Sequence, residues 1–274
     1  MRLRVVPRAL LALLAALVAA ACTTVDDPDA ALPWRLVFQD EFDGAPGARP
    51  DPATWTFELG GNGWGNQELQ HYTDRPENAA LDGSGALVLT ARREPFEGRD
   101  YTSARLTTRG KREQAYGRFE ARLALPEGKG LWPAFWLLGA DNAVVGWPAC
   151  GEIDVVESRG AQPWRVLGSA HGPGYSGGNA IIGSFETADR SSLADGFHVY
   201  AVEWEPDELR FWVDGQRYQT VRPSSLRGGA RWVFDHPFFM ILNLAVGGNF
   251  GGAPDATTVF PQRLRVDYVR VYAH

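Results

Sequence analysis

Short runs of alternating or β-branched residues recur along this chain between turn residues, and this spacing limits its fold more than any other feature. The runs lie at residues 35–38, 86–91, 116–125, 166–171, 197–204, 209–213, 238–246 and 264–272. Repeated short strands of this kind are typical of β-sandwiches, and no stretch has the apolar period of a helix. The pattern predicts an all-β sandwich of two antiparallel sheets, with a hairpin turn at Asp214-Gly215.

The N-terminus has the pattern of an export signal. Three arginines precede an apolar stretch at 9–21, which is short for a membrane span and ends in small residues. We expect residues 1–21 to be a cleaved signal peptide and the polar residues 22–33 to be a tether. Because no linker, charge block or repeat follows, residues 34–274 are predicted to form one domain.

Cys22 leaves two exported forms open. The small residues before it suit ordinary signal cleavage, and they also resemble a lipobox, in which the cysteine after the cut carries a lipid. The resemblance is imperfect because Ala19 stands where a lipobox normally has leucine. The protein is therefore expected to be either extracellular or anchored by a lipid at Cys22 to the bacterial cell surface, and we favour the anchor.

Charge and metal-ligand spacing exclude several function classes. Cleavage after Ala21 would remove three arginines and change the net charge from −6 to −9, which argues against nucleic acid or an anionic membrane as a partner. The five histidines lack the spacing of a zinc site, so we expect no catalytic cofactor. Cys150 has no nearby partner cysteine and is expected to be a free thiol in a monomeric protein.

Three carboxylates interrupt a β-branched run at residues 150–157 and mark the candidate active site. Strand side chains alternate between faces, so Glu152 and Asp154 share a face while Glu157 has the wrong parity. One extra residue at Val155 or Val156, forming a β-bulge, would return Glu157 to the same face. The carboxyl groups could then approach the ~5–5.5 Å separation of a retaining glycosidase; a row of exposed acids on an edge strand is the alternative.

Three tryptophans lie just upstream of these acids. Trp132 and Trp136 are four residues apart and would share one strand face, and Trp147 follows in a turn. Indole rings offer flat apolar surface to sugars and an N–H for a hydroxyl, although packing in a core is the competing interpretation. The combination of carboxylates and aromatic rings favours a carbohydrate site.

Several ordered motifs carry a resemblance to a known family. The chain resembles the bacterial β-1,3-glucanases, or laminarinases, of glycoside hydrolase family 16, from about Trp34 to the C-terminus. The resemblance implies a β-jelly roll with an open substrate cleft on its concave face, and retaining hydrolysis of internal bonds in a β-glucan polysaccharide. The motifs lie at residues 61–70, 101–106, 132–136, 151–157 and 266–272.

The resemblance also assigns roles to the acids. It implies that Glu152 is the nucleophile, that Glu157 is the acid and then the base, and that Asp154 supports the pair. Packed carboxylates cannot all ionise cheaply, which agrees with one holding a proton while another stays charged.

Further residues carry over from the family one by one. Asn62 and Trp64, in a Gly-rich loop, would contact sugar hydroxyls and a ring face. Arg105 would donate to hydroxyls or steady the nucleophile, with a surface ion pair as the alternative. His171 would bond a sugar or Glu157, and a purely structural histidine is the other interpretation.

A structural calcium and two rival functions complete the expectations. The resemblance would place Glu41 and Asp267 near a calcium ion, although Asp267 could equally face solvent or pair with an arginine. The rivals are a non-catalytic β-glucan-binding module and a same-fold enzyme acting on mixed-linkage glucan, agarose or carrageenan. Both glutamates are present, which favours catalysis, and the named loops carry few lysines for a sulfated substrate.

Overall fold

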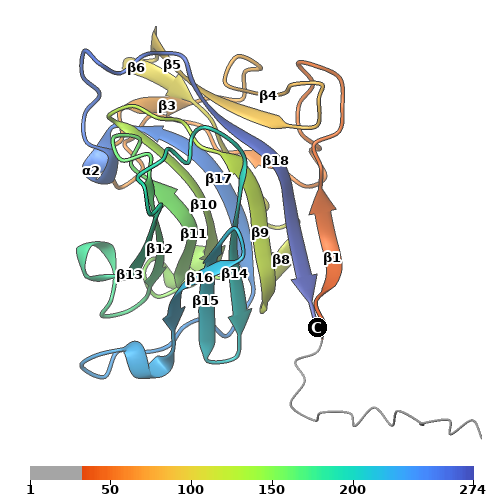
Figure 1. The fold of residues 1–274 in the computed structure, drawn as a ribbon, viewed down its shortest axis with the longest axis vertical. Coiled ribbons are helices and arrows are strands. Elements are labelled where there is room, and N and C mark those ends of the chain that lie inside the picture. The colour runs from red at the N-terminus through yellow and green to blue at the C-terminus, as the bar shows by residue number, and fades with distance from the viewer. Residues whose placement is uncertain (1–32) are drawn as a thin grey trace, which may run out of the picture. The chain divides into compact units, whose positions relative to one another are not determined.

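Two large sheets pack face to face in the computed structural model, which describes residues 33–274. Residues 34–274 form one compact unit. Every strand pairing is antiparallel except that of β3 with β6. In Figure 1, β18 and β1 lie side by side at the right, and β10, β11 and β12 lie at the left. The predicted all-β sandwich of two mainly antiparallel sheets is thus confirmed.

The larger sheet has ten strands. Its main path runs in the order β16, β15, β14, β9, β18, β5, β6 and β3, and β1 and β4 pair with β18 and β5. The bounds are β16 Gln216–Val221, β15 Glu208–Val213, β14 His198–Glu205, β9 Gly117–Ala124, β18 Gln262–Ala273, β5 Leu87–Phe96, β6 Arg99–Ser103, β3 Gln70–Tyr72, β1 Arg35–Asp40 and β4 Ala79–Leu81.

The smaller sheet has eight strands and carries the candidate site. Its order is β13, β12, β11, β10, β17, β7 and β2, and β8 pairs with β17. The bounds are β13 Ile181–Glu186, β12 Arg165–His171, β11 Glu152–Ser158, β10 Leu131–Gly139, β17 Phe238–Val246, β7 Arg105–Thr107, β2 Thr56–Phe57 and β8 Glu113–Gln114. The helical segments are short: α1 Asn142–Val145, α2 Gly248–Gly251, η1 Gly177–Asn179 and η2 Pro223–Ser225.

Strand alternation builds the core between the sheets. On β10, Phe135 and Leu137 point into the core, whereas Trp132 and Trp136 lie on the opposite face and are half-buried. All nine residues of β17 are buried, because its outer side is also covered. Both tryptophans therefore lie outside the core between the sheets, although Trp136 packs against a smaller apolar cluster that includes Leu138 and Phe239.

The tight turn between β15 and β16 has the predicted form. Val213 pairs with Gln216, so Asp214 and Gly215 make a two-residue connection. Their φ angles of 46° and 74° are the positive values that this kind of hairpin turn requires.

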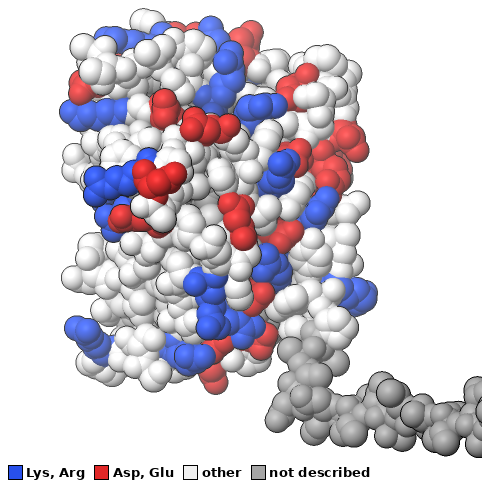
Figure 2. All heavy atoms as spheres, in the orientation of Figure 1, with Lys and Arg blue, Asp and Glu red and all other residues white. Residues whose placement is uncertain are grey.

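Charges on the visible face of the molecule are mixed. Figure 2 shows acidic and basic side chains interspersed over this face. No helix within residues 33–274 is both long and apolar enough to cross a membrane. The expected signal peptide at 1–21, the lipid anchor at Cys22 and nearly all of the tether at 22–33 lie outside the described residues.

Candidate active site

A β-bulge in β11 brings the three acids to one face of the smaller sheet. Asp154 pairs with Ser169 and Glu157 with Leu167, so two residues, Val155 and Val156, oppose one on β12. Both valines are buried in the core. Two consecutive inward side chains restore Glu157 to the outer face that Glu152 and Asp154 already share. The bulge predicted from the sequence is present.

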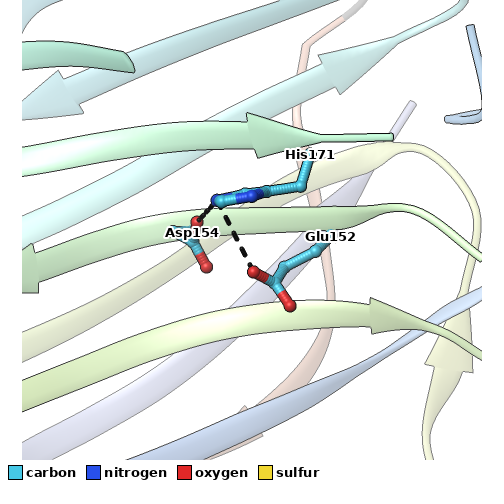
Figure 3. A group of neighbouring side chains, drawn as sticks. All are labelled: Glu152, Asp154 and His171. Carbon is cyan, nitrogen blue, oxygen red and sulfur yellow. Dashed lines mark ion pairs between the residues drawn. The ribbon is translucent and has the colours of Figure 1, made fainter. Parts of the chain in front are cut away.

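His171, at the end of β12, lies against two of these acids. Its Nε2 is 2.9 Å from Oδ2 of Asp154 and 3.6 Å from Oε1 of Glu152. Figure 3 shows the imidazole directed toward both carboxylates, which project from the neighbouring strand. The backbone N–H of Gly177 donates to Nδ1 at 3.2 Å. The prediction that His171 bonds Glu157 is wrong, because the β11–β12 register sets it opposite Glu152.

These three side chains also have the spacing of a cation site. One donor atom from each of Glu152, Asp154 and His171 lies within 4.8 Å of the others. Two carboxylates and an imidazole suit a divalent ion of the zinc type. The same arrangement is also explained without a cation, because a cluster of acids beside a histidine has this spacing.

Burial controls the electrostatics of the acids. It raises the pKa of Asp154 to about 8. Burial, with the neighbouring charge of Asp154, likewise raises the pKa of Glu152 to about 8, and His171 and Arg105 act in the opposite direction. The pKa of Glu157 is raised to about 8 by burial and by Asp154. Three closely spaced carboxyl groups therefore share protons near neutral pH.

Trp132 holds Glu157 in place. Its indole N–H donates to Oε1 of Glu157 at 2.9 Å, which favours the charged carboxylate and lowers its pKa. The other side of the Trp132 ring meets Phe250, whose ring centroid lies 5.0 Å away. Arg159 covers Phe250 at 4.2 Å. This aromatic pair lies at the Glu157 end of the acid row.

Arg105 lies between two tryptophans. Its guanidinium carbon is 4.7 Å from the ring centroid of Trp64 and 4.8 Å from that of Trp136. Its Nε donates to Glu58, so Arg105 does form an ion pair, but the pair is largely buried and is not the surface pair of the alternative prediction. Arg105 still lowers the pKa of Glu152 through its charge. It therefore orders the tryptophans and supports the acids together.

The indole N–H groups of three tryptophans are occupied by the protein. Trp136 donates to Oδ1 of Asn243 at 2.7 Å, and Trp64 donates to the carbonyl of Gly60 at 3.0 Å. Trp132 donates to Glu157 as described above. The expectation that the indole N–H bonds a sugar hydroxyl is therefore wrong for Trp132 and Trp136, because each N–H already donates to a protein acceptor. What the rings can offer to a ligand is their apolar surface.

The remaining predicted contacts lie on loops around the sheet. Asn62 accepts the backbone N–H of Trp64 on its Oδ1, and this stabilises the loop at a residue with φ of 50°. Trp147 follows α1, is 49% exposed, and has its ring centroid 6.1 Å from that of His171. Trp147 thus adds an exposed ring beside the acids.

The side chains named for calcium are both held by arginines. Glu41 receives two hydrogen bonds from Arg270, at 2.8 and 3.0 Å. Asp267 receives one from Arg122 at 2.7 Å. Calcium needs six to eight oxygen ligands and unneutralised charge, so these carboxylates as they stand do not fit that ion. The alternative of pairing with an arginine is the arrangement observed for Asp267.

Sequence reasoning missed a second layer of residues beneath the site. Glu58 holds Arg105, Asn243 holds Trp136, and Glu68 and Tyr72 lie behind Asn243. A charged or amide residue within an otherwise apolar strand, such as Asn243 in residues 238–246, was the available signal.

Comparisons with known proteins show what the sequence and the fold are similar to. A family model described as glycosyl hydrolases family 16 matches residues 66–270. A β-glucanase of Rhodothermus marinus is 44% identical over 99% of this chain and 96% of its own length. The chain covers 38% of the glucan endo-1,3-β-glucosidase A1 of Niallia circulans, at 37% identity over 87% of this chain. The laminarinase catalytic domain of Thermotoga maritima superposes with a TM-score of 0.83 at 48% identity, over 88% of this chain and 98% of that one.

Proposed function

The chain belongs to glycosyl hydrolase family 16, and we propose that it is a secreted, retaining enzyme that cuts internal β-1,3-glucosidic bonds of β-glucans such as laminarin. The observation that carries the proposal is the bulge in β11, which gathers Glu152, Asp154 and Glu157 on one face of the sheet. A retaining glycoside hydrolase requires two carboxyl groups that flank the scissile bond, and a shared face makes this possible for Glu152 and Glu157.

In the first step Glu152 and Glu157 act together. The Glu152 carboxylate attacks the anomeric carbon and forms an ester, while protonated Glu157 gives its proton to the departing glycosidic oxygen. The raised pKa of Glu157 keeps that proton available near neutral pH. The charges of His171 and Arg105 help Glu152 to ionise.

In the second step Glu157, now a carboxylate, takes a proton from water. The water oxygen attacks the anomeric carbon, the ester to Glu152 breaks, and the sugar leaves with its original configuration. The N–H of Trp132 stabilises the charged Glu157 at this stage. Asp154 lies between the two glutamates on the same face and adjusts their protonation through its own charge.

Substrate contacts follow from the surroundings of the acids. We propose that sugar rings of the glucan stack on the faces of Trp132, Trp136 and Trp147. The loop that carries Asn62 and Trp64 is assigned to the end of the bound glucan that lies farther from the acids. Arg105 and His171 act on the acids rather than as free donors.

The direct test is product analysis on laminarin. The wild type should release a ladder of short β-1,3 oligomers, and Glu152→Ala and Glu157→Ala should reduce release by about 10³-fold or more. Activity on agarose, carrageenan or mixed-linkage glucan alone would keep the mechanism and overturn the substrate. Wild-type binding without release from any of these glycans would favour the binding-module alternative.

Retention has its own measurement. Proton NMR of the reaction at early time should detect the β-anomer before mutarotation. First appearance of the α-anomer would contradict the role of Glu152 as a nucleophile.

Export and the lipid anchor are tested at the mature N-terminus. We propose cleavage after Ala21 and lipidation of Cys22. Mass spectrometry of the protein from its host membrane should detect a diacylglyceryl-modified Cys22, with Cys22→Ser as the control. An unmodified Cys22 would leave an extracellular enzyme.

Calcium is tested by thermal unfolding. A structural calcium ion would have to displace Arg270 or Arg122 from its carboxylate partner, or bind through backbone oxygens. Because these carboxylates are already paired with arginines, we expect chelation to leave the melting temperature unchanged, and a lower melting temperature after chelation would contradict this expectation.

A further inference from the structure

Glu68 is a buried carboxylate that the proposed mechanism does not use. It is 3% exposed and lies in the loop before β3. Its Oε2 accepts the side-chain N–H of Gln70 at 2.6 Å and the hydroxyl of Tyr72 at 3.1 Å, and its Oε1 accepts Asn66 at 3.4 Å. A carboxylate removed from water in this way is costly unless its donors are held in place.

The backbone fixes the orientation of Gln70, one of the donors to Glu68. The backbone N–H of Val246 donates to Oε1 of Gln70 at 2.7 Å. This turns the amide nitrogen of Gln70 toward Glu68, because the two ends of an amide cannot both accept. Glu68 must therefore present an acceptor to Gln70.

A hydrogen-bond chain runs from Glu68 to the floor of the active site. The indole nitrogen of Trp136 can only donate, so Asn243 presents Oδ1 to it. The Asn243 amide nitrogen then faces the hydroxyl of Tyr72 at 3.3 Å. That hydroxyl accepts from Asn243 and donates to Glu68. The donor and acceptor of each hydrogen bond in this series follow from the assignment of the previous bond.

The chain ends at an aromatic residue beside the acids. Trp136 pairs with Asp154 across β10 and β11. Arg105 covers its ring at 4.8 Å and sets the plane of the ring, whereas the bond to Asn243 sets its rotation within that plane. Tyr72 also meets the ring of Trp64 edge-on, with centroids 5.3 Å apart.

We propose that Glu68 is a positioning residue for glucan binding, because it holds the ring of Trp136 in one orientation through Tyr72 and Asn243. The proposal rests on the proposed function, which makes Trp136 a sugar contact. Glu68 touches neither substrate nor the reacting atoms. Its effect is therefore expected on KM, and the chemical step should be nearly unchanged.

Tyr72→Phe interrupts the hydrogen-bond chain between Glu68 and Asn243 but keeps the aromatic ring that contacts Trp64. We expect KM for laminarin to rise about three- to tenfold with kcat within about twofold, the range of one net hydrogen bond. Glu68→Leu removes both acceptor oxygens, so it should act in the same direction and serves if Tyr72→Phe does not fold, whereas Glu68→Gln keeps an acceptor for Gln70 and Tyr72 and should change KM little. The matched control is Tyr200→Phe, which also removes a fully buried hydroxyl, one that has no hydrogen-bond partner among the described residues.

A double-mutant cycle tests the path. In a Trp136→Phe background the indole N–H is absent, so Tyr72→Phe should have no further effect on KM. Independent, additive effects of the two substitutions on KM would overturn the proposal, as would a lower melting temperature with unchanged KM.

A measurement that does not depend on enzymatic activity separates the positioning role of Glu68 from the proposed glucanase function. The ¹⁵N–¹H signal of the Trp136 indole, identified by its loss in Trp136→Phe, should shift and exchange faster with solvent in Tyr72→Phe but not in Tyr200→Phe. An unchanged signal would contradict the positioning chain. An inactive wild type with the expected change in this signal would reject the glucanase proposal and retain the chain.

Discussion

At the scale of single residues, a few contacts set the protonation of the acids. Glu152 and Glu157 have the same direction of pKa shift from the same first cause, burial. Their partners differ, since Glu157 accepts an indole N–H and Glu152 lies near His171. Burial acts on both acids alike, so a difference between their protonation has to come from these partners.

Trp132→Phe should move the basic limb of the pH–rate profile to higher pH. The lost N–H donor stabilised the charged form of Glu157, so the pKa of Glu157 rises and its catalytic proton is retained longer. The measurement is kcat/KM against pH. Trp136→Phe is the control, because its N–H bonds Asn243 instead of an acid. A basic limb that stays in place would contradict the role of Trp132.

Asp154→Asn should move both limbs of that profile to lower pH. After burial, the charge of Asp154 is the largest influence that raises the pKa of Glu152 and of Glu157, so its removal lets both ionise earlier. Residual kcat/KM against pH is the measurement, with the exposed Asp189→Asn as control. A shift of one limb while the other stays in place would show that Asp154 acts on one glutamate only.

At the scale of elements, the bulge of β11 is the feature on which the site depends. Without the extra residue, alternation would send Glu157 into the core, where Val156 now lies. Loops supply Trp64 and Trp147, but the acids and His171 lie on paired strands, which hold them more rigidly.

Deletion of Val155 should abolish glucanase activity and destabilise the protein strongly. One residue fewer removes the bulge, so either Glu157 or a valine must change faces. Activity and thermal unfolding are the measurements. Val155→Ala keeps the bulge and should cost about 1–3 kcal/mol of stability, with kcat largely retained. An active deletion variant would contradict the geometry.

At the scale of the whole molecule, the three acids of the site make the stability of the fold decrease as the pH rises. Their folded-state pKa values of about 8 lie well above the ordinary values of 4.5 for Glu and 3.8 for Asp. The unfolded chain therefore releases these protons first as the pH rises. Their contribution to stability is fully present below the unfolded pKa and is lost progressively up to about pH 8.

Glu152→Gln should therefore unfold at a higher temperature than the wild type at pH 8 and should depend less on pH. Replacing one carboxyl group whose pKa is raised should increase the free energy of unfolding at pH 8 by about 1–3 kcal/mol. For a domain of this size, each kcal/mol raises the melting temperature by about 2–4 °C. Melting curves from pH 5 to 9 test it, with exposed Glu77→Gln as control. A variant less stable than the wild type at pH 8 would reverse the sign of the argument.

The sequence by itself determined the local features of this protein. A continuous run of strand-forming apolar residues predicted the strand at 238–246 to the residue, and the Asp214-Gly215 turn followed from backbone geometry. The bulge at Val155 or Val156 was predicted because the three acids share a face only with one extra residue there. The two-residue strands β2 and β8 escaped detection, because two residues have no period. Short-range sterics act between neighbours, so these features can be read without the fold.

Only the tertiary structure decided which distant side chains meet. His171 contacts Asp154 and Glu152 because of the register between β11 and β12. Arg105 fits between Trp64 and Trp136 because β7, β17 and β10 are neighbours in the smaller sheet. Tyr72 bonds Asn243 across 171 residues of sequence because β3, at the end of the larger sheet, meets β17 of the smaller one. Such contacts arise from strand order and packing of the layers, which no local period encodes.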